Sequence, residues 1–253
     1  MTSLTDVPGV GVGHWQDDVA LTGVTVLTFP EPNVAAVEVR GAAPGTRETA
    51  LLAPGMKVEQ IQALMFAGGS AFGLGAADGV VAALAAEGRG HPTVGGPIPI
   101  VPAAILYDLM LGDAAVRPSA DSGAAAFRNV TQEENRRGTV GAGAGALVAG
   151  WRGPSAFRKG GLGMASMPVG GGVVAALAVV NAVGDVFSIE GEPLTEGPLR
   201  PGPPAEWPKP LEATTLVCVV TDVGLSRTDL MRACVRGHDA IGTCIRPSHT
   251  RYD

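Results

Sequence analysis

The sequence predicts an α+β fold, because two kinds of segment with different patterning occur along the same chain. Residues 173–181 and 216–220 are continuous apolar runs rich in valine, as is typical of buried strands. Residues 76–87 are alanine-rich and residues 227–241 place Leu230, Ala233, Cys234 and Ile241 near one face, as is typical of helices. The 253 residues are 46% hydrophobic, which suffices for one large domain or two modest ones.

The N-terminal half is predicted to hold strands at residues 23–29, 35–39 and 61–66. Turn residues separate the first two, and residues 7–13 are expected to be a turn-rich entry. The helix over 76–87 should stop at Gly88, and a second helix is expected over 119–128 with Asp121 or Ser122 near its start. Alternate prolines make residues 95–102 extended, and an apolar element follows from residue 103.

The C-terminal half begins with two glycine-rich stretches, residues 138–145 and 160–163, which are expected to be loops. The strand over 173–181 is expected to turn at Gly184 and Asp185 and to pair with residues 186–189. A strand then begins near Thr215, and the helix over 227–241 follows it.

The composition argues against several classes of protein. The net charge of −6, without a long basic run, disfavours nucleic acid or anionic membranes as partners. Three cysteines without CxxC spacing disfavour a disulfide framework or a zinc site, and the four histidines are too scattered for a metal site. Residues 1–10 do not resemble a signal peptide and no run of 18 apolar residues occurs, so a cytoplasmic location is expected.

The stretch from residue 193 to 222 is the most unusual part of the chain. It holds seven prolines, which remove backbone donors and exclude a helix interior or a central strand, and it then runs directly into the apolar strand. Thr214 and Thr215 stand at the junction. Composition alone is compatible with an interdomain linker before an ordinary strand. A hydroxyl residue at the mouth of a buried strand, behind an exposed loop, is also where self-cleavage would create an N-terminal nucleophile.

Thr214 combines the groups that such chemistry needs. An N-terminal threonine requires no histidine, because its α-amine has a pKa of about 8 and can take the proton of the hydroxyl. Cutting the Ala213–Thr214 bond would create this amine, and the exposed proline segment would permit the cut. Asn181, an amide at the end of an apolar strand, and Tyr107 could donate hydrogen bonds to the reacting oxygen.

Two other motifs have features of functional sites. Ser70 in GGSAFG resembles a nucleophile elbow, but Phe72 occupies the place of the second glycine in G-x-S-x-G, so a serine hydrolase is the weaker hypothesis. The glycines of residues 138–145 lack the G-x-G-x-x-G spacing of a dinucleotide site. Close backbone packing is the expected use of that second stretch.

Ordered blocks along the whole chain resemble a known family. They include VPGVGVGH from Val7, GGSAFGL from Gly68, PIPIVPAAILYDL from Pro97, GTVGAGAGA from Gly138, KGGLG from Lys159, VVNAVGDV from Val179, TTLVCVVTD from Thr214 and IRPSHTRYD from Ile245. On these blocks the chain is identified as similar to the self-processing L-aminopeptidase/D-amidase-esterases, with the β-peptidyl aminopeptidases and the nylon-oligomer hydrolases.

The resemblance implies a four-layer αββα sandwich of the N-terminal-nucleophile type, formed by a single domain over residues 1–253. It implies self-cleavage into a long chain 1–213 and a short chain 214–253, and homo-oligomers. N-terminal threonine chemistry needs no metal or other cofactor, so none is expected. The substrate would be a small peptide or amide, cleaved at a peptide N-terminal residue or an ω-amino-acid amide.

The resemblance also assigns roles to residues. Thr214 would be the nucleophile, Asn181 the oxyanion amide, and Tyr107 a second hydrogen-bonding group. Lys159 would belong to the catalytic set, and Gly69 and Ser70 would line the substrate site. Family members continue past the equivalent of Asp253, so Asp253 is expected to be the first of two acids at a shortened C-terminus. The alternative is a truncated or unprocessed, non-catalytic member that serves as an assembly or binding subunit.

Overall fold

The computed structural model describes residues 2–207 and 211–253, and it folds into two sheets flanked by helices. The first sheet has the order β1-β2-β4-β5-β3, made by β1 (Gly11–Asp17), β2 (Thr22–Thr28), β4 (Ala63–Ala67), β5 (Ala103–Ile105) and β3 (Thr46–Arg47). The second has the order β11-β9-β8, made by β11 (Thr214–Thr221), β9 (Gly172–Asn181) and β8 (Gly161–Val169). Two short pairs join β10 (Asp185–Val186) to β12 (Ile245–Arg246) and β6 (Leu147–Val148) to β7 (Arg158–Lys159).

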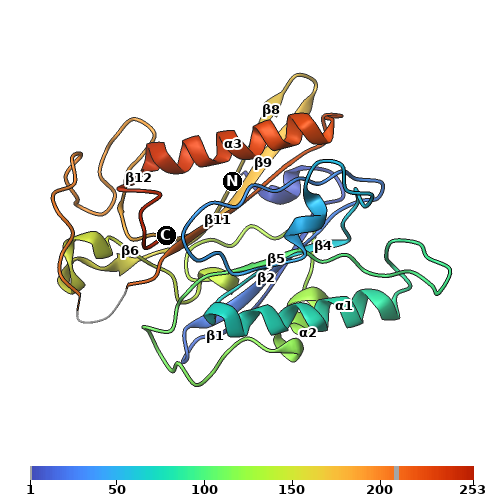
Figure 1. Ribbon diagram of the computed structural model, residues 1–253, viewed down its shortest axis with the longest axis horizontal. Helices are drawn as coiled ribbons and strands as arrows, with labels where there is room; N and C mark the ends of the chain where they lie inside the picture. The colour runs from blue at the N-terminus through green and yellow to red at the C-terminus, as the bar shows by residue number, and fades with distance from the viewer. Residues whose placement is uncertain (1, 208–210) are drawn as a thin grey trace.

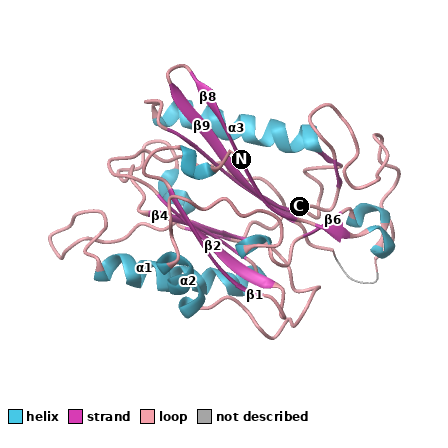
Figure 2. Cartoon of the chain, turned by 180° about the vertical axis from the view of Figure 1, so that it is seen from behind, coloured by secondary structure: helices cyan, strands magenta, loops and turns pink. Residues whose placement is uncertain are grey.

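The layers confirm the predicted αββα sandwich. Figure 1 shows α3 (Arg227–Cys244) over the three-stranded sheet, the five-stranded sheet beneath it, and α1 (Ala76–Ala86) with α2 (Ala120–Arg128) on the far side. Figure 2 shows the same stacking from behind. Aliphatic side chains of both sheets, among them Leu27, Leu177 and Val179, form the central core. A second core packs α1 and α2 against the first sheet.

Local patterning predicted the longer elements well. The helices expected over 76–87, 119–128 and 227–241 are α1, α2 and α3. Ser119 is the N-cap of α2, and Asp121 and Ser122 lie in its first turn, near the start as expected. The strand expected behind the proline segment is β11, which begins at Thr214. It is only partly buried, with Cys218 its one fully buried residue and Val219 exposed. Of the proline segment, residues 208–210 lie outside the described residues.

The partner predicted for the strand over 173–181 was wrong. That strand, β9, pairs with β8 and β11, whereas residues 185–186 pair with β12. The reason lies in Gly170 and Gly171, which both have positive φ and form a two-residue turn between β8 and β9. Such turns match the twist of hairpin strands and require φ above zero at both positions. Residues 161–163, expected to be a loop, are therefore the start of β8.

Two N-terminal predictions were also wrong. Residues 35–39 join no sheet, because residues 63–67 occupy the place beside β2. Residues 11–13, expected to belong to a turn, begin β1. A Cβ atom on Gly13 would lie 2.3 Å from the carbonyl oxygen of Ala126, so glycine lets α2 approach the strand. The glycines there serve close packing rather than a turn.

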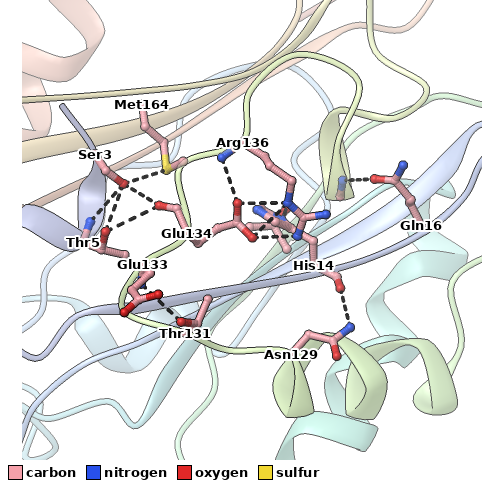
Figure 3. Close-up of polar contacts among 12 residues, drawn as sticks. Ser3, Thr5, His14, Gln16, Asn129, Thr131, Glu133, Glu134, Arg136 and Met164 are labelled. Carbon is pink, nitrogen blue, oxygen red and sulfur yellow. Dashed lines mark hydrogen bonds and ion pairs between the residues drawn. The ribbon is translucent and has the colours of Figure 1, made fainter. Parts of the chain in front are cut away.

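Polar contacts attach β1 to the segment after α2 (Figure 3). Asn129 donates a hydrogen bond to the carbonyl oxygen of His14, and Gln16 accepts one from the N–H of Gly141. Glu134 forms an ion pair with Arg136. The contact from Gln16 to Gly141 holds the glycine block 138–145 against the first sheet.

Candidate active site

The register of the second sheet sets Thr214 opposite Asn181. Thr214 is the first residue of β11 and Asn181 the last of β9, and the two are partners in an antiparallel ladder. Residues directly opposite on neighbouring strands have Cβ atoms about 4.5–5.5 Å apart. The structure thus brings together a hydroxyl and a carboxamide that are far apart in the sequence.

The Ala213–Thr214 bond is held on both sides. The Thr214 hydroxyl donates a 2.6 Å hydrogen bond to the carbonyl oxygen of Ala213, so Oγ1 lies beside the peptide group that self-cleavage would cut. The N–H of Ala213 donates to the carbonyl oxygen of Tyr252 at 2.7 Å. Ala213 itself is buried in an apolar cluster with Val183 and Leu211. These contacts restrict the bond before β11 to one position.

The Asn181 side chain is buried and its orientation follows from its partners. Its Oδ1 accepts the N–H of Leu147 at 2.8 Å, and its Nδ2 donates to the carbonyl oxygen of Tyr107 at 2.9 Å. An N–H can only donate and a carbonyl can only accept, so the network assigns the two ends of the amide. The NH₂ group has a second hydrogen, which Tyr107 does not use and which is suited to a reacting carbonyl oxygen.

A small pocket opens beside these groups. Its lining includes Tyr107, Asn181 and Ala213, together with the apolar side chains of Leu147, Phe157, Val183 and Leu211 and the carboxylates of Asp108 and Glu212. Tyr107 reaches Asn181 through its main-chain carbonyl; its hydroxyl makes no hydrogen bond within the described residues. Thr214, Lys159, Gly69 and Ser70 adjoin this lining rather than form it.

Lys159 is connected to Asn181 through one strand pair. It lies opposite Leu147 in the β6–β7 ladder, and the N–H of Leu147 is the group that Asn181 accepts. The ammonium donates to the carbonyl oxygens of Gly143, Ala146 and Gly160 at 2.9–3.3 Å. Burial lowers the pKa of Lys159 to about 8, and the negative charge of Asp108 opposes this change. The lysine therefore titrates near pH 8 while it holds the glycine block.

Gly69 and Ser70 form a tight turn after β4. Both have positive φ, and the N–H of Ser70 donates to the carbonyl oxygen of Leu106 at 3.0 Å. The N–H of Gly69 donates to Oδ1 of Asp108 at 2.7 Å. Asp108 escaped the sequence analysis, although an acid within the apolar run of residues 103–109 was a visible signal. Burial raises the pKa of its carboxyl group, against three hydrogen bonds, from Gly69, Thr22 and its own N–H, and the charge of Lys159.

Asp253 and Cys218 make no hydrogen bond to Thr214 within the described residues. The Asp253 carboxylate accepts hydrogen bonds from the N–H and hydroxyl of Thr250 in its own turn, while its main-chain oxygen accepts from Ala42. Cys218 is buried, and burial raises the pKa of its thiol to about 12, so it stays protonated and unreactive. The described residues contain no cluster of three metal-binding side chains, and their helices are too short or too polar to cross a membrane.

The four-layer αββα arrangement is the Ntn hydrolase fold. The chain belongs to peptidase family S58, whose profile matches residues 2–253, and it is a hydrolase that acts on peptide or amide bonds.

Three relatives illustrate this family. An uncharacterized aminopeptidase of Mycobacterium leprae is 40% identical, over all of this chain and 76% of its own length. The 6-aminohexanoate-oligomer endohydrolase of Paenarthrobacter ureafaciens is 30% identical, over 98% of this chain and 71% of its own. The structure of the L-aminopeptidase D-Ala-esterase/amidase of Ochrobactrum anthropi, described as a variant of the Ntn hydrolase fold, has a TM-score of 0.73 at 22% identity. The structural match covers 99% of this chain and 71% of the Ochrobactrum anthropi chain, and the match supports the fold assignment.

Proposed function

We propose that the protein is an N-terminal-nucleophile aminopeptidase or amidohydrolase, in which Thr214 is the nucleophile after self-cleavage at Ala213–Thr214. The observation that carries the proposal is the position of the Thr214 hydroxyl, 2.6 Å from the Ala213 carbonyl oxygen and opposite Asn181 in the strand ladder. Nucleophile, scissile peptide and candidate oxyanion donor thus share one end of the sheet.

Self-cleavage would proceed by an acyl shift. Oγ1 of Thr214 bonds to the carbonyl carbon of Ala213 as the C–N bond breaks, and the hydroxyl proton ends on the Thr214 nitrogen. Water then cleaves the resulting ester, which leaves a carboxylate on Ala213 and a free amine on Thr214. The second hydrogen of Asn181 Nδ2 would stabilise the negative oxygen that develops in each step.

Turnover would repeat this chemistry on a substrate. The free amine of Thr214 accepts the hydroxyl proton, Oγ1 attacks the amide carbon, and the proton passes to the departing amine. Water then releases the acid from the threonyl ester. The apolar pocket walls with Glu212 suit an aliphatic acyl chain that bears an amino group. The activities named for the relatives, aminopeptidase and 6-aminohexanoate-oligomer hydrolase, agree with such a substrate. A cytoplasmic location and homo-oligomeric assembly stay predictions.

The mass of the purified protein tests the first step. We expect two fragments, one ending at Ala213 and one starting at Thr214, and hydrolysis of aminoacyl-nitroanilides or short 6-aminohexanoate oligomers. Thr214→Ala should leave one intact chain without turnover. Ser70→Ala is the matched control, and it should keep both cleavage and activity. An intact wild-type chain with no turnover would favour the non-catalytic alternative, whereas loss of activity only in Ser70→Ala would favour a serine hydrolase.

A further inference from the structure

We propose that Asp108 is a positioning residue of this site: its buried carboxylate fixes the Gly69–Ser70 turn beside Tyr107 and supplies negative charge that favours the ammonium form of Lys159. The proposal rests on the proposed function, because it assigns Asp108 to the site of Thr214 and Asn181. Asp108 follows Tyr107 directly and lines the same pocket, yet it makes no hydrogen bond to either Thr214 or Asn181 within the described residues.

Both oxygens of the Asp108 carboxylate are engaged by different parts of the first sheet. Oδ1 accepts the N–H of Gly69 at 2.7 Å, and Oδ2 accepts the hydroxyl of Thr22, at the start of β2, at 2.8 Å. The residue is 3% exposed, so these bonds are shielded from water. Hydrogen bonds to an ionised acceptor are shorter and about twice as strong as neutral ones. The carboxylate thereby ties the turn after β4 to the adjacent strand.

Two glycine motifs leave just enough space for this carboxylate. A Cβ atom on Gly68 would lie 1.9 Å from Asp108 Oδ2, and one on Gly145 would lie 2.9 Å from the same oxygen. A side chain at position 68 would displace the carboxylate, and one at position 145 would collide with both Asp108 and the carbonyl oxygen of Leu21. The blocks GGSAFG and GAGAGA, which a nucleophile elbow and a dinucleotide loop do not explain, thus converge on a single acidic group.

The segment of residues 106–108 is joined to the turn of residues 67–70 by three hydrogen bonds. The N–H of Leu106 donates to Ala67, the N–H of Ser70 donates to Leu106, and the N–H of Gly69 donates to Asp108. The carbonyl between them, that of Tyr107, is the acceptor for Asn181 Nδ2. Fixing Asp108 therefore fixes the acceptor that orients the candidate oxyanion amide.

Asp108 and Lys159 act on each other electrostatically across the glycine block. Lys159 binds the carbonyl oxygens of Gly143 and Ala146, which flank the Gly145 that covers Asp108. The Asp108 charge raises the pKa of Lys159 against the effect of burial, and the Lys159 charge lowers that of Asp108. Glu212 is the other carboxylate on the pocket wall, and it is exposed to solvent. Asp108 is buried whereas Lys159 is exposed, and the charge of Asp108 favours a cation beside the strand that contacts Asn181.

The variant Asp108→Asn removes the negative charge of residue 108 and keeps the size and shape of its side chain. Asparagine can accept from Gly69 with its oxygen and donate to the Thr22 hydroxyl with its nitrogen, so both hydrogen bonds persist while the charge is lost. The matched control is Thr22→Val, which removes one hydrogen bond and keeps the charge. Metabolic labelling with [ε-¹³C]lysine gives only three side-chain signals, from Lys57, Lys159 and Lys209, so NMR can follow Lys159 directly.

We expect the titration midpoint of Lys159 to fall in Asp108→Asn and to stay unchanged in Thr22→Val. In the processed enzyme, the alkaline limb of the kcat profile should move down with it, and kcat should fall at least tenfold with KM within twofold. A Lys159 midpoint equal to that of wild type in folded Asp108→Asn overturns the proposal, whatever the activity. Absence of turnover in the wild-type protein would instead contradict the proposed function. The Lys159 titration would then still decide whether Asp108 has the proposed role.

A second variant covers the case in which Asp108→Asn does not fold. Lys159→Met removes the cation, so the pKa of the Asp108 carboxyl, followed in protein labelled with [γ-¹³C]aspartate, should rise. A carboxyl midpoint equal to that of wild type would overturn the proposal equally well.

Discussion

The N–H of Ala213 donates a 2.7 Å hydrogen bond to the carbonyl oxygen of Tyr252, which anchors the residue before Thr214 to the turn that follows β12. The Tyr252 ring also packs edge-on against Trp151, with 6.4 Å between ring centroids. The residue on the acyl side of the candidate scissile bond, Ala213, is therefore held by the segment around Tyr252. This contact and others in the structure lead to four predictions.

Loss of the Tyr252 ring should slow self-cleavage. Tyr252→Ala removes the contact with Trp151, worth about 1 kcal/mol beyond buried area, and loosens the turn that holds Ala213. We expect slower appearance of the fragment that begins at Thr214, measured by mass spectrometry over time after synthesis. Tyr252→Phe keeps the ring and should cleave at the wild-type rate; equal rates in all three proteins would contradict a role for this anchor.

Replacing Asn181 should affect both stability and turnover. Asn181→Ala leaves the N–H of Leu147 and the carbonyl of Tyr107 without their Asn181 partner. Each unsatisfied group lowers the free energy of unfolding by about 1–3 kcal/mol. Loss of an oxyanion donor typically lowers kcat by about 10²–10³-fold. Urea unfolding and nitroanilide hydrolysis measure the two effects. Asn181→Asp, which keeps the bond from Leu147 but not the donor, should lose activity as Ala does; full activity in it would remove Asn181 from the mechanism.

The activity should have a pH optimum near 8. The Thr214 amine must lose its proton to act as base, with an ordinary pKa of about 8, so activity rises as pH approaches that value. Burial lowers the pKa of Lys159 to about 8, so above that pH the ammonium becomes neutral and loses one of its three donors. A kcat profile from pH 6 to 10 should be bell-shaped. Lys159→Met should lose the alkaline limb, and a limb that persists unchanged in this variant would assign it to another group.

Acid should destabilise the protein through His14. Burial lowers the pKa of His14 to about 4 from an unfolded value of 6.5, so between these values the unfolded chain binds more protons than the folded one. Stability is therefore complete above about pH 6.5 and is lost as pH falls towards 4, by an amount on the order of 3 kcal/mol. Glu134, with a pKa of about 2, stays ionised over that range.

Urea midpoints at pH 7 and pH 4.5 measure this loss. The variant His14→Gln does not titrate, and the difference between its two midpoints should be smaller than that of wild type. A variant that loses as much stability with acid as wild type would place the acid sensitivity elsewhere.

The elements that the sequence predicted correctly are those encoded by neighbouring residues. Alanine-rich or amphipathic periodicity located α1 and α3, and the change from prolines to valines placed a strand near Thr215, one residue from the start of β11 at Thr214. The pairing of β9 was mispredicted because a run of valines records burial but not which strand lies beside it. The Gly170–Gly171 turn was a local signal for the β8–β9 hairpin that the prediction overlooked.

The candidate site, too, could be predicted only in part from neighbouring residues. The residue types of Thr214, Asn181, Tyr107 and Lys159 and their ordered motifs could be recognised along the chain, since each motif is contiguous. Their contacts could not: Tyr107 reaches Asn181 through its backbone, and Asp108 links two glycine motifs that lie far apart in the sequence.

The sequence by itself determined the fold class, the family and the candidate nucleophile, because composition, periodicity and motifs are properties of adjacent residues. Only the tertiary structure decided that Thr214 lies opposite Asn181, that Tyr252 anchors Ala213, and that a buried carboxylate stands between the glycine blocks. Strand register, burial and electrostatic environment arise when distant segments pack together, and it is these that set hydrogen-bond partners and pKa values.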